Sequence, residues 1–277
     1  MTERAFDAMG GEWWVSTDRG DLLDGAVAEV EKIEAALSRF RPDSALSRLN
    51  RERTCEDPIL ACVAAAAIRA RQETDGAFDP TLGDELTAWG YGAPLDTLAG
   101  RRGRAPTGRS VLVVDVSGNR VRLHGRGSLD LGGIGKGWAV DQLVVWLRAA
   151  GAKAGLVDGA GDLRGFGPPW AIGLPDGGAI ELVDAAVATS STLERRWFAE
   201  DGRLVHHLLD PATGAPVLGP VHTVTTTART ATQAETWAKA ILVRPELAER
   251  FERPGQTAWL GDDEGRWWTS NPGAVAC

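Results

Sequence analysis

The amino-acid sequence predicts an α/β fold of the irregular α+β kind, because the expected helices and strands are interleaved without a regular β-α-β repeat. Apolar residues at helical spacing predict a helix over residues 21–40, and similar patterns occur over 59–73 and 231–243. Two alternating apolar stretches, 111–116 and 120–124, are joined by Ser117-Gly118-Asn119, which predicts a β-hairpin.

The remaining elements follow from local signals taken in chain order. Residues 5–17 are expected to form one strand, and Asp43-Ser44 is expected to start a short helix. The polar stretch 92–109 predicts a surface loop, and a glycine-rich turn at 132–137 is expected to open a helix that runs to residue 150. Further elements are expected as strands near 154–158, 171–174, 180–183, 186–189, 204–209 and 221–227 and around Trp259 and Trp267-Trp268, with a short helix over 245–252.

Composition excludes several classes of protein. The chain has 277 residues, a formal charge of −8 and a pI of about 5.1, so it lacks the basic balance of a nucleic-acid binder. Its three cysteines show no C-x-x-C spacing, which argues against a disulfide scaffold and fits a reducing compartment. We see neither a signal-peptide pattern nor an apolar run of about 20 residues that could cross a membrane. The expectation is a cytoplasmic protein without membrane insertion.

The glycine-rich turn is the first candidate site. Gly132-Gly133-Ile134-Gly135-Lys136-Gly137 fails the spacing of a P-loop and of a dinucleotide-binding fingerprint. It still suits an anion, because glycines let backbone N–H groups approach a phosphate, Lys136 adds a positive charge, and a helix begins there. Asp130 precedes the turn. The alternative is a tight turn with a surface lysine.

Two further clusters contain candidate residues. His206 and His207 are adjacent on an expected strand, where successive side chains face opposite sides, so only one of them can line a given pocket. The other is then a packing or surface residue. Asp79-Pro80-Thr81 is the third cluster, and its alternative interpretation is an ordinary helix N-cap.

Taken together and in order, these clusters resemble the FAD:protein FMN transferase family, also called ApbE-like proteins. The resemblance covers nearly the whole chain. The segments that carry it are Ala8-Met9-Gly10, Leu37-Ser38-Arg39-Phe40, Pro42-Asp43-Ser44, Leu49-Asn50, Gly76-Ala77-Phe78-Asp79-Pro80-Thr81, Trp89-Gly90-Tyr91, Leu129–Asp141, Asp158-Gly159-Ala160-Gly161-Asp162, Ala188-Thr189-Ser190, Glu194-Arg195 and His206–Pro216.

The resemblance implies a single domain over residues 1–277, with two lobes and an FAD cleft between them. It implies that the protein binds FAD, cleaves the pyrophosphate and joins FMN to a Ser or Thr of an acceptor flavoprotein, releasing AMP. The residues implied in FAD binding are Met9, Phe40, Ala77, Phe78, Asp79, Asp130, Lys136, His207 and Leu208, with Thr189 and Ser190 at the cleft wall. His207 and Lys136 are the implied catalytic residues, and the base could be His207 or a flanking carboxylate.

The implied magnesium site departs from the family pattern. The Gly133 carbonyl matches a backbone ligand, and Glu235 replaces the family's Asp. Lys239 replaces the family's Thr, and a protonated ammonium has no lone pair with which to bind a metal. Three alternatives follow: Lys239 supplies the charge itself, Mg²⁺ binds weakly without it, or the helix only packs.

Two alternative functions stay open. An FAD pyrophosphatase would use the same cleft with water as the nucleophile and release FMN and AMP. A flavin carrier that lost catalysis with its metal site is the second alternative, and it depends on the change from Thr to Lys at position 239.

Overall fold

A computed structural model describes residues 1–93 and 103–269. The chain forms two compact units. Unit 1 consists of Met1–Ile33, Ile134–Ser190 and Pro220–Cys277, and unit 2 consists of Glu34–Gly133 and Ser191–Gly219. Helices and strands mix in both, which confirms the predicted fold class.

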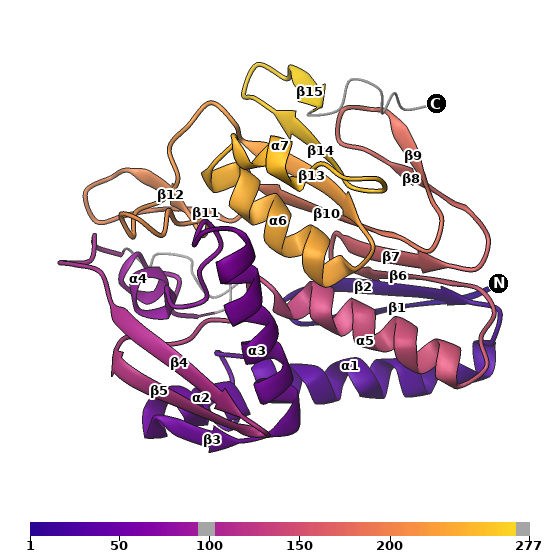
Figure 1. Ribbon diagram of the computed structural model, residues 1–277, viewed down its shortest axis with the longest axis horizontal. Coiled ribbons are helices and arrows are strands. Elements are labelled where there is room, and N and C mark those ends of the chain that lie inside the picture. Colours follow the sequence, from indigo (N-terminus) through magenta and orange to yellow (C-terminus); the bar gives the residue numbers. More distant parts are fainter. Residues whose placement is uncertain (94–102, 270–277) are drawn as a thin grey trace. The chain divides into compact units, whose positions relative to one another are not determined.

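An eight-stranded sheet is the centre of unit 1 (Figure 1). Its strand order is β1-β2-β6-β7-β10-β13-β14-β15. Six pairs of neighbouring strands are antiparallel, namely β1-β2, β2-β6, β6-β7, β7-β10, β13-β14 and β14-β15. The strands are β1 (Thr2–Ala8), β2 (Gly11–Thr17), β6 (Gly155–Gly159), β7 (Asp162–Phe166), β10 (Ala186–Ser191), β13 (Thr223–Ala228), β14 (Thr257–Gly261) and β15 (Trp267–Thr269). β8 (Trp170–Gly173) and β9 (Ala179–Leu182) form a separate antiparallel hairpin.

The prediction of one strand over residues 5–17 is wrong, because the chain reverses at Met9-Gly10. Both residues have left-handed backbone, with φ of 50° and 78°, and β1 then pairs with β2 so that Phe6 faces Trp13. Gly10 adopts this conformation without a steric cost, whereas Met9 is an uncommon residue there. The apolar residues on both sides of the turn concealed it in the sequence.

Two helices of unit 1 pack against each other and against the sheet. α5 (Gly135–Ala149) contacts β6 and β7, and α6 (Ala231–Val243) contacts β13 (Figure 1). A Cβ at Gly137 would lie 2.5 Å from the carbonyl oxygen of Ala231, so only glycine permits this approach of the two helices. The predicted helices over 231–243 and from the glycine turn to 150 are confirmed. α1 (Leu23–Leu37) and α7 (Leu247–Phe251) are slightly shorter at both ends than the helices predicted over 21–40 and 245–252.

The described residues of unit 2 form three helices and two small sheets. Ser44 caps α2 (Ala45–Glu52) by accepting from Ser47 N at 2.9 Å, as the prediction of a helix start there required. The other elements are α3 (Pro58–Glu73), α4 (Gly83–Ala88), the sheet β3 (Thr54–Glu56), β5 (Arg120–Arg126) and β4 (Val111–Ser117), and the hairpin of β11 (Arg196–Phe198) and β12 (Leu204–His206). The predicted hairpin at 111–124 is confirmed, whereas β3, α4, β7 and β11 were not predicted.

The core of unit 2 is built around two tryptophans. Trp89 and Trp197 are 2% and 7% exposed, and they pack with Leu82, Val205 and Leu209. Nε1 of Trp89 donates to the Gly214 carbonyl at 2.8 Å, and Nε1 of Trp197 donates to the Trp89 carbonyl at 2.7 Å. The Trp89-Gly90-Tyr91 segment is thereby fixed to the turn that follows the two histidines.

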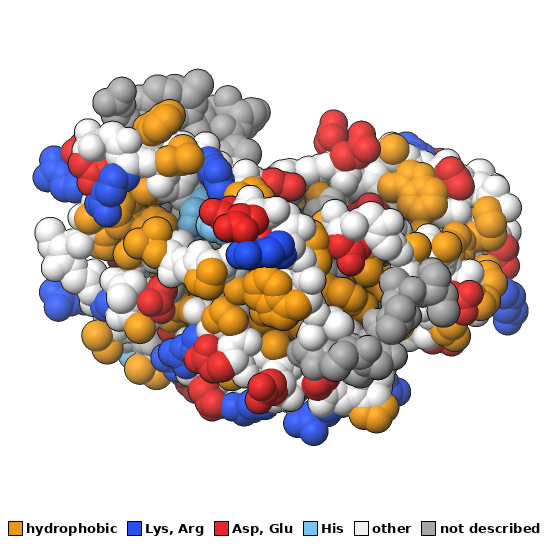
Figure 2. Space-filling view, turned by 90° about the horizontal axis from the view of Figure 1, so that it is seen from above, with side chains coloured by type: hydrophobic (Ala, Val, Ile, Leu, Met, Phe, Trp, Pro, Cys, Tyr) orange, Lys and Arg blue, Asp and Glu red, His pale blue; other side chains and the backbone are white. Residues whose placement is uncertain are grey.

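Half of the predicted surface loop over 92–109, namely 94–102, lies outside the described residues. Among the described residues on the face shown in Figure 2, blue cationic and red acidic side chains alternate rather than gather by sign. None of the described helices is both long and apolar enough to span a bilayer.

Candidate functional site

The predicted lysine of unit 1 is held by a buried carboxylate. The ammonium of Lys136, at the first turn of α5, forms an ion pair with Oδ2 of Asp162, the first residue of β7. The side chain of Asp162 is 2% exposed and that of Lys136 is 15% exposed. The carboxylate is therefore enclosed, while part of the lysine side chain stays exposed.

Burial raises the pKa of Asp162 to about 6. The negative charge of Glu235 acts in the same direction, and Lys136 and Lys239 oppose it. Burial also raises the pKa of Asp158, whose Oδ1 accepts from Gly161 N at 2.8 Å. Lys136 thus lies among several carboxylates of unit 1.

A second lysine-carboxylate pair lies on α6. Nζ of Lys239 is 3.0 Å from Oε1 of Glu235, one helical turn earlier, and the Glu235 side chain is 0% exposed. Oε2 of Glu235 accepts from the backbone N of Gly137 at 2.9 Å. Burial opposes the ionisation of Glu235, but Lys239 and Lys136 outweigh it and lower its pKa.

The residues present do not fit the magnesium ion that the resemblance implies. An ammonium stands where a hydroxyl ligand is required, and each oxygen of Glu235 already accepts a hydrogen bond. Gly133 belongs to unit 2 and Glu235 belongs to unit 1. We therefore assign no chemical step to a metal ion.

In unit 2, Arg39 joins three of the predicted segments. Its Nε lies 2.9 Å from Oδ2 of Asp130, and its guanidinium lies 4.5 Å from the ring centre of Phe40 and 4.6 Å from that of Tyr91. The Tyr91 ring is also 6.2 Å from that of His207 and stacks on Trp197 at 5.5 Å. Phe40, Asp130 and His207 are therefore linked through Arg39 and Tyr91.

The two adjacent histidines differ in their surroundings. Nδ1 of His206 accepts from Leu208 N at 3.3 Å, so its Nε2 carries the proton and donates to the Val217 carbonyl at 3.1 Å. His206 is 8% exposed, whereas His207 is half-buried and follows the last residue of β12. The expectation that one histidine is a packing residue is confirmed for His206.

The Asp79 cluster is a turn and not a helix cap. Oδ1 of Asp79 accepts from N and Oγ1 of Thr81 at 2.9 Å and 2.7 Å, while Oδ2 lies 3.1 Å from Nε of Arg71 and 3.5 Å from NH2 of Arg109. The N-cap alternative is wrong, because α4 begins after Leu82 without a side-chain cap.

The other predicted residues are distributed over both units. Ala77, Phe78 and Leu208 are buried in unit 2, with exposures of 2%, 5% and 7%. In unit 1, Met9 is half-buried in the β1–β2 turn, Ser190 is buried, and Oγ1 of Thr189 is 2.9 Å from Oγ1 of Thr225.

Four residues that contact the predicted site residues or pack next to them received no role from the sequence. They are Arg39, Tyr91, Asp162 and Trp197. Three of them stand inside or at the end of segments that carry the resemblance, and this position was the available signal. Their partners are distant in the chain: Arg39 reaches Asp130, and Asp162 reaches Lys136.

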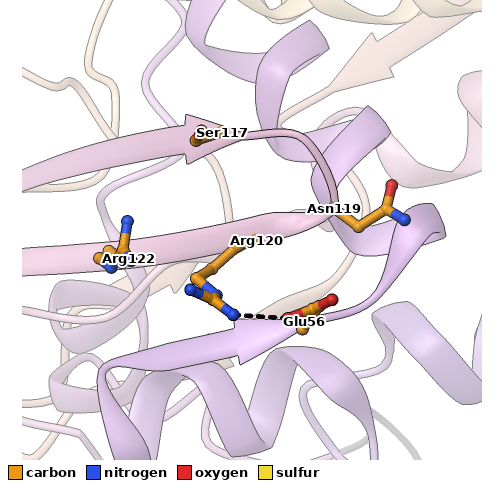
Figure 3. Close-up of a pocket in the computed structure, with 5 residues that line it drawn as sticks. All are labelled: Glu56, Ser117, Asn119, Arg120 and Arg122. Atoms are coloured by element: carbon orange, nitrogen blue, oxygen red, sulfur yellow. Dashed lines mark hydrogen bonds and ion pairs between the residues drawn. The ribbon is translucent and has the colours of Figure 1, made fainter.

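A pocket elsewhere in unit 2 contains none of the predicted residues. It has a volume of about 160 Å³ and lies by the three-stranded sheet (Figure 3). Its lining residues are Glu56, Ser117, Asn119, Arg120 and Arg122. Arg120 NH2 pairs with Oε2 of Glu56 at 2.8 Å, so the charge of this arginine is already matched.

Comparison with known proteins gives a consistent result. A model described as the ApbE family matches residues 9–257. The chain is 31% identical over 245 residues to an FAD:protein FMN transferase of Vibrio cholerae, covering 78% of this chain and 71% of the relative. It is also 31% identical over 257 residues to the Salmonella typhimurium protein of that name, covering 83% and 73%.

Solved structures agree with the fold. An ApbE protein of Thermotoga maritima superposes with a TM-score of 0.83 at 28% identity, covering 96% of both chains. The apo form of the Pseudomonas stutzeri flavinyl transferase ApbE superposes with a TM-score of 0.82 at 26% identity, covering 97% of this chain and 93% of that one.

Proposed function

The chain belongs to the ApbE family, and we propose that it is an FAD:protein FMN transferase. It binds FAD, cleaves the pyrophosphate and attaches FMN to a Ser or Thr hydroxyl of an acceptor flavoprotein, with AMP as the second product. The cysteine pattern fits a reducing compartment, and the proposal includes an acceptor in the same compartment, the cytoplasm.

The observation that carries this proposal is the placement of Lys136. Its ammonium stands at the N-terminal end of α5 and is anchored by Asp162 from behind, while its own side chain stays 15% exposed. A helix N-terminus and a fixed cation are a suitable environment for a pyrophosphate. Lys136 therefore neutralises charge that otherwise repels an attacking hydroxyl.

The reaction balances as a phosphoryl-group transfer. The acceptor oxygen attacks the phosphorus of the FMN half, the bond from that phosphorus to the bridging oxygen breaks, and AMP leaves with the bridging oxygen. The proton of the hydroxyl passes to a base, for which we propose the ring of His207. Tyr91 packs edge-on against this ring and orients it.

The flavin and adenosine parts of FAD contact the remaining predicted residues. Phe40 supplies an aromatic surface whose orientation is fixed by Arg39. Ala77 and Phe78 are almost fully buried and their backbone N–H groups donate to Thr74, so they shape the FAD site by packing. Asp79, Asp130, Met9 and Leu208 complete the proposed binding set, together with Thr189, an exposed residue whose hydroxyl is hydrogen-bonded to that of Thr225.

One assay tests the proposal against both alternatives. The protein is incubated with FAD and a candidate acceptor, the acceptor is weighed by mass spectrometry, and AMP is measured by chromatography. We expect AMP together with an acceptor whose mass has grown by one FMN. AMP without that gain would identify a pyrophosphatase, and FAD binding without AMP would identify a carrier. An acceptor in which the target Ser or Thr is replaced by Ala is the matched control.

A further inference from the structure

Two lysines of unit 1 stand in front of two buried carboxylates. Lys136 pairs with Asp162, and Lys239 pairs with Glu235. The carboxylate side chains are 2% and 0% exposed, whereas the lysine side chains are 15% and 17% exposed. The negative groups are thus enclosed, whereas the two lysine side chains keep part of their surface exposed.

The two pairs are joined into one cluster. Gly137, next to Lys136 on α5, donates its backbone N–H to Glu235 on α6 at 2.9 Å. The charge of Glu235 affects the pKa of Asp162, and the charge of Lys136 affects that of Glu235. The close approach of α5 and α6 at Gly137 therefore sets the position of Lys239 relative to Lys136.

The third alternative, a helix that only packs with Lys239 at the surface, does not agree with this geometry. Lys239 is mostly buried, and its ammonium bonds the innermost carboxylate of the cluster. A divalent ion beside Glu235 would have to displace or repel that ammonium. Lys239 therefore occupies the place and charge of a cation.

We propose that the ammonium of Lys239 is a built-in replacement for a divalent cation, so that the protein holds the FAD pyrophosphate with Lys136 and Lys239 and without Mg²⁺. This inference rests on the proposed function for its ligand. The flexible stem of a lysine lets the ammonium keep its bond to Glu235 and direct its other N–H groups to a phosphate oxygen.

The first test measures FAD affinity by flavin fluorescence in EDTA and in MgCl2. The wild type is expected to have the same affinity in both buffers. Lys239→Met removes the charge and is expected to weaken binding about tenfold or more in both buffers, which corresponds to one lost charge-assisted contact. Lys239→Arg keeps the charge and is expected to restore metal-independent binding.

Lys239→Thr introduces the hydroxyl that a metal site needs. This variant is expected to bind FAD tightly only with MgCl2, and Mg²⁺ is expected to raise its Tm, whereas the Tm of the wild type stays constant. Lys32→Met is the matched control, because Lys32 is a lysine of α1 in the same unit with a 65% exposed side chain, and we expect it to leave FAD affinity unchanged. Circular dichroism checks that each variant is folded.

Two results would overturn the inference. The first is a wild type that loses FAD binding in EDTA and regains it with MgCl2. The second is a folded Lys239→Met protein with unchanged FAD affinity. If no variant binds FAD in any buffer, the proposed function fails instead, and the Mg²⁺ dependence of Tm still decides the metal question: a wild type stabilised by Mg²⁺ contradicts the built-in cation.

Discussion

Arg39 is ion-paired with Asp130 inside unit 2, with Nε of the guanidinium 2.9 Å from Oδ2 of the carboxylate. The two side chains are only 14% and 9% exposed. The guanidinium also lies against the Phe40 and Tyr91 rings and donates to the Tyr91 carbonyl. One arginine therefore holds an acidic residue and two aromatic residues that the family resemblance picked out separately.

Arg39→Ala is expected to destabilise the protein by about 3–5 kcal/mol, because it leaves the buried carboxylate of Asp130 without its cation and removes the packing on two rings. Urea unfolding followed by circular dichroism measures the change. Arg39→Lys is the matched control, which keeps the charge but not the planar stacking, and we expect an intermediate loss. An Arg39→Ala protein within 1 kcal/mol of the wild type, given typical errors, would contradict the role assigned to this pair.

Asp162 is expected to make the stability of the protein depend on pH between about 4 and 6. Its pKa is 3.8 in the unfolded chain and about 6 in the folded protein, so the folded state binds the proton more tightly. Stability from this group is present below pH 4 and is lost as the pH rises through 6, by up to roughly 3 kcal/mol.

The comparison with Asp162→Asn isolates this contribution, because the amide does not titrate. The unfolding free energy of the wild type minus that of the variant is expected to fall as the pH is raised from 4 to 6, and to level off above. Urea unfolding at a series of pH values measures it. A difference that stays constant or rises with pH would show that Lys136 outweighs burial at this carboxylate.

Much of the fold could be predicted because local patterns determine it. The helix over 231–243 was predicted with the bounds that the structure has, since its apolar spacing and the turn before it are both local. The reversal at Met9 was missed because a non-glycine residue adopts left-handed backbone there. The short strands β3 and β11 were also missed, because three residues are too few to show the alternation of apolar and polar side chains that marks a strand.

The candidate site could be predicted only in part, for a different reason. The sequence pointed to Lys136, Asp130 and His207, and the family resemblance supported them, but neither gave partners for them. Arg39 meets Asp130, and Asp162 meets Lys136, only when the chain folds. The spacing of residues in the sequence does not determine which distant side chains come into contact. Lys239 was the exception, since its partner Glu235 is one helical turn away.

Asp141 is expected to be a structural residue of unit 1. Its Oδ1 accepts from Ala231 N at 2.9 Å and its Oδ2 from Thr232 N at 2.9 Å, so α5 supplies the carboxylate that caps the start of α6. Arg164 NH1 pairs with it at 2.7 Å. Asp141→Asn removes the charge and one acceptor, and we expect a loss of about 1–3 kcal/mol.

Asp24→Asn is the control for this variant. Asp24 is an aspartate of α1 whose side chain is 91% exposed, so its replacement is expected to change stability by less than about 0.5 kcal/mol. Urea unfolding of both variants gives the comparison. Equal and small losses would show that the cap on α6 contributes nothing measurable.

His206 and His207 are expected to respond to substitution in opposite ways. His206 uses both ring nitrogens, toward Leu208 N and the Val217 carbonyl, so His206→Ala leaves a buried backbone donor and acceptor without these partners. We expect it to lose about 2 kcal/mol or more of stability. His207→Ala removes a half-buried ring beside Tyr91, and we expect a smaller loss, of about 1 kcal/mol.

Activity separates the two histidines further. If His207 is the base for the acceptor hydroxyl, His207→Ala is expected to lower the rate of FMN transfer about 100-fold or more, while FAD affinity changes little. Residual transfer by His207→Ala is expected to rise with pH, because a free hydroxyl ionises more readily as the proton concentration falls. The measurements are FMN transfer by mass spectrometry, FAD affinity by fluorescence and unfolding in urea. A His207→Ala protein with the transfer rate and pH profile of the wild type would assign the base to another group.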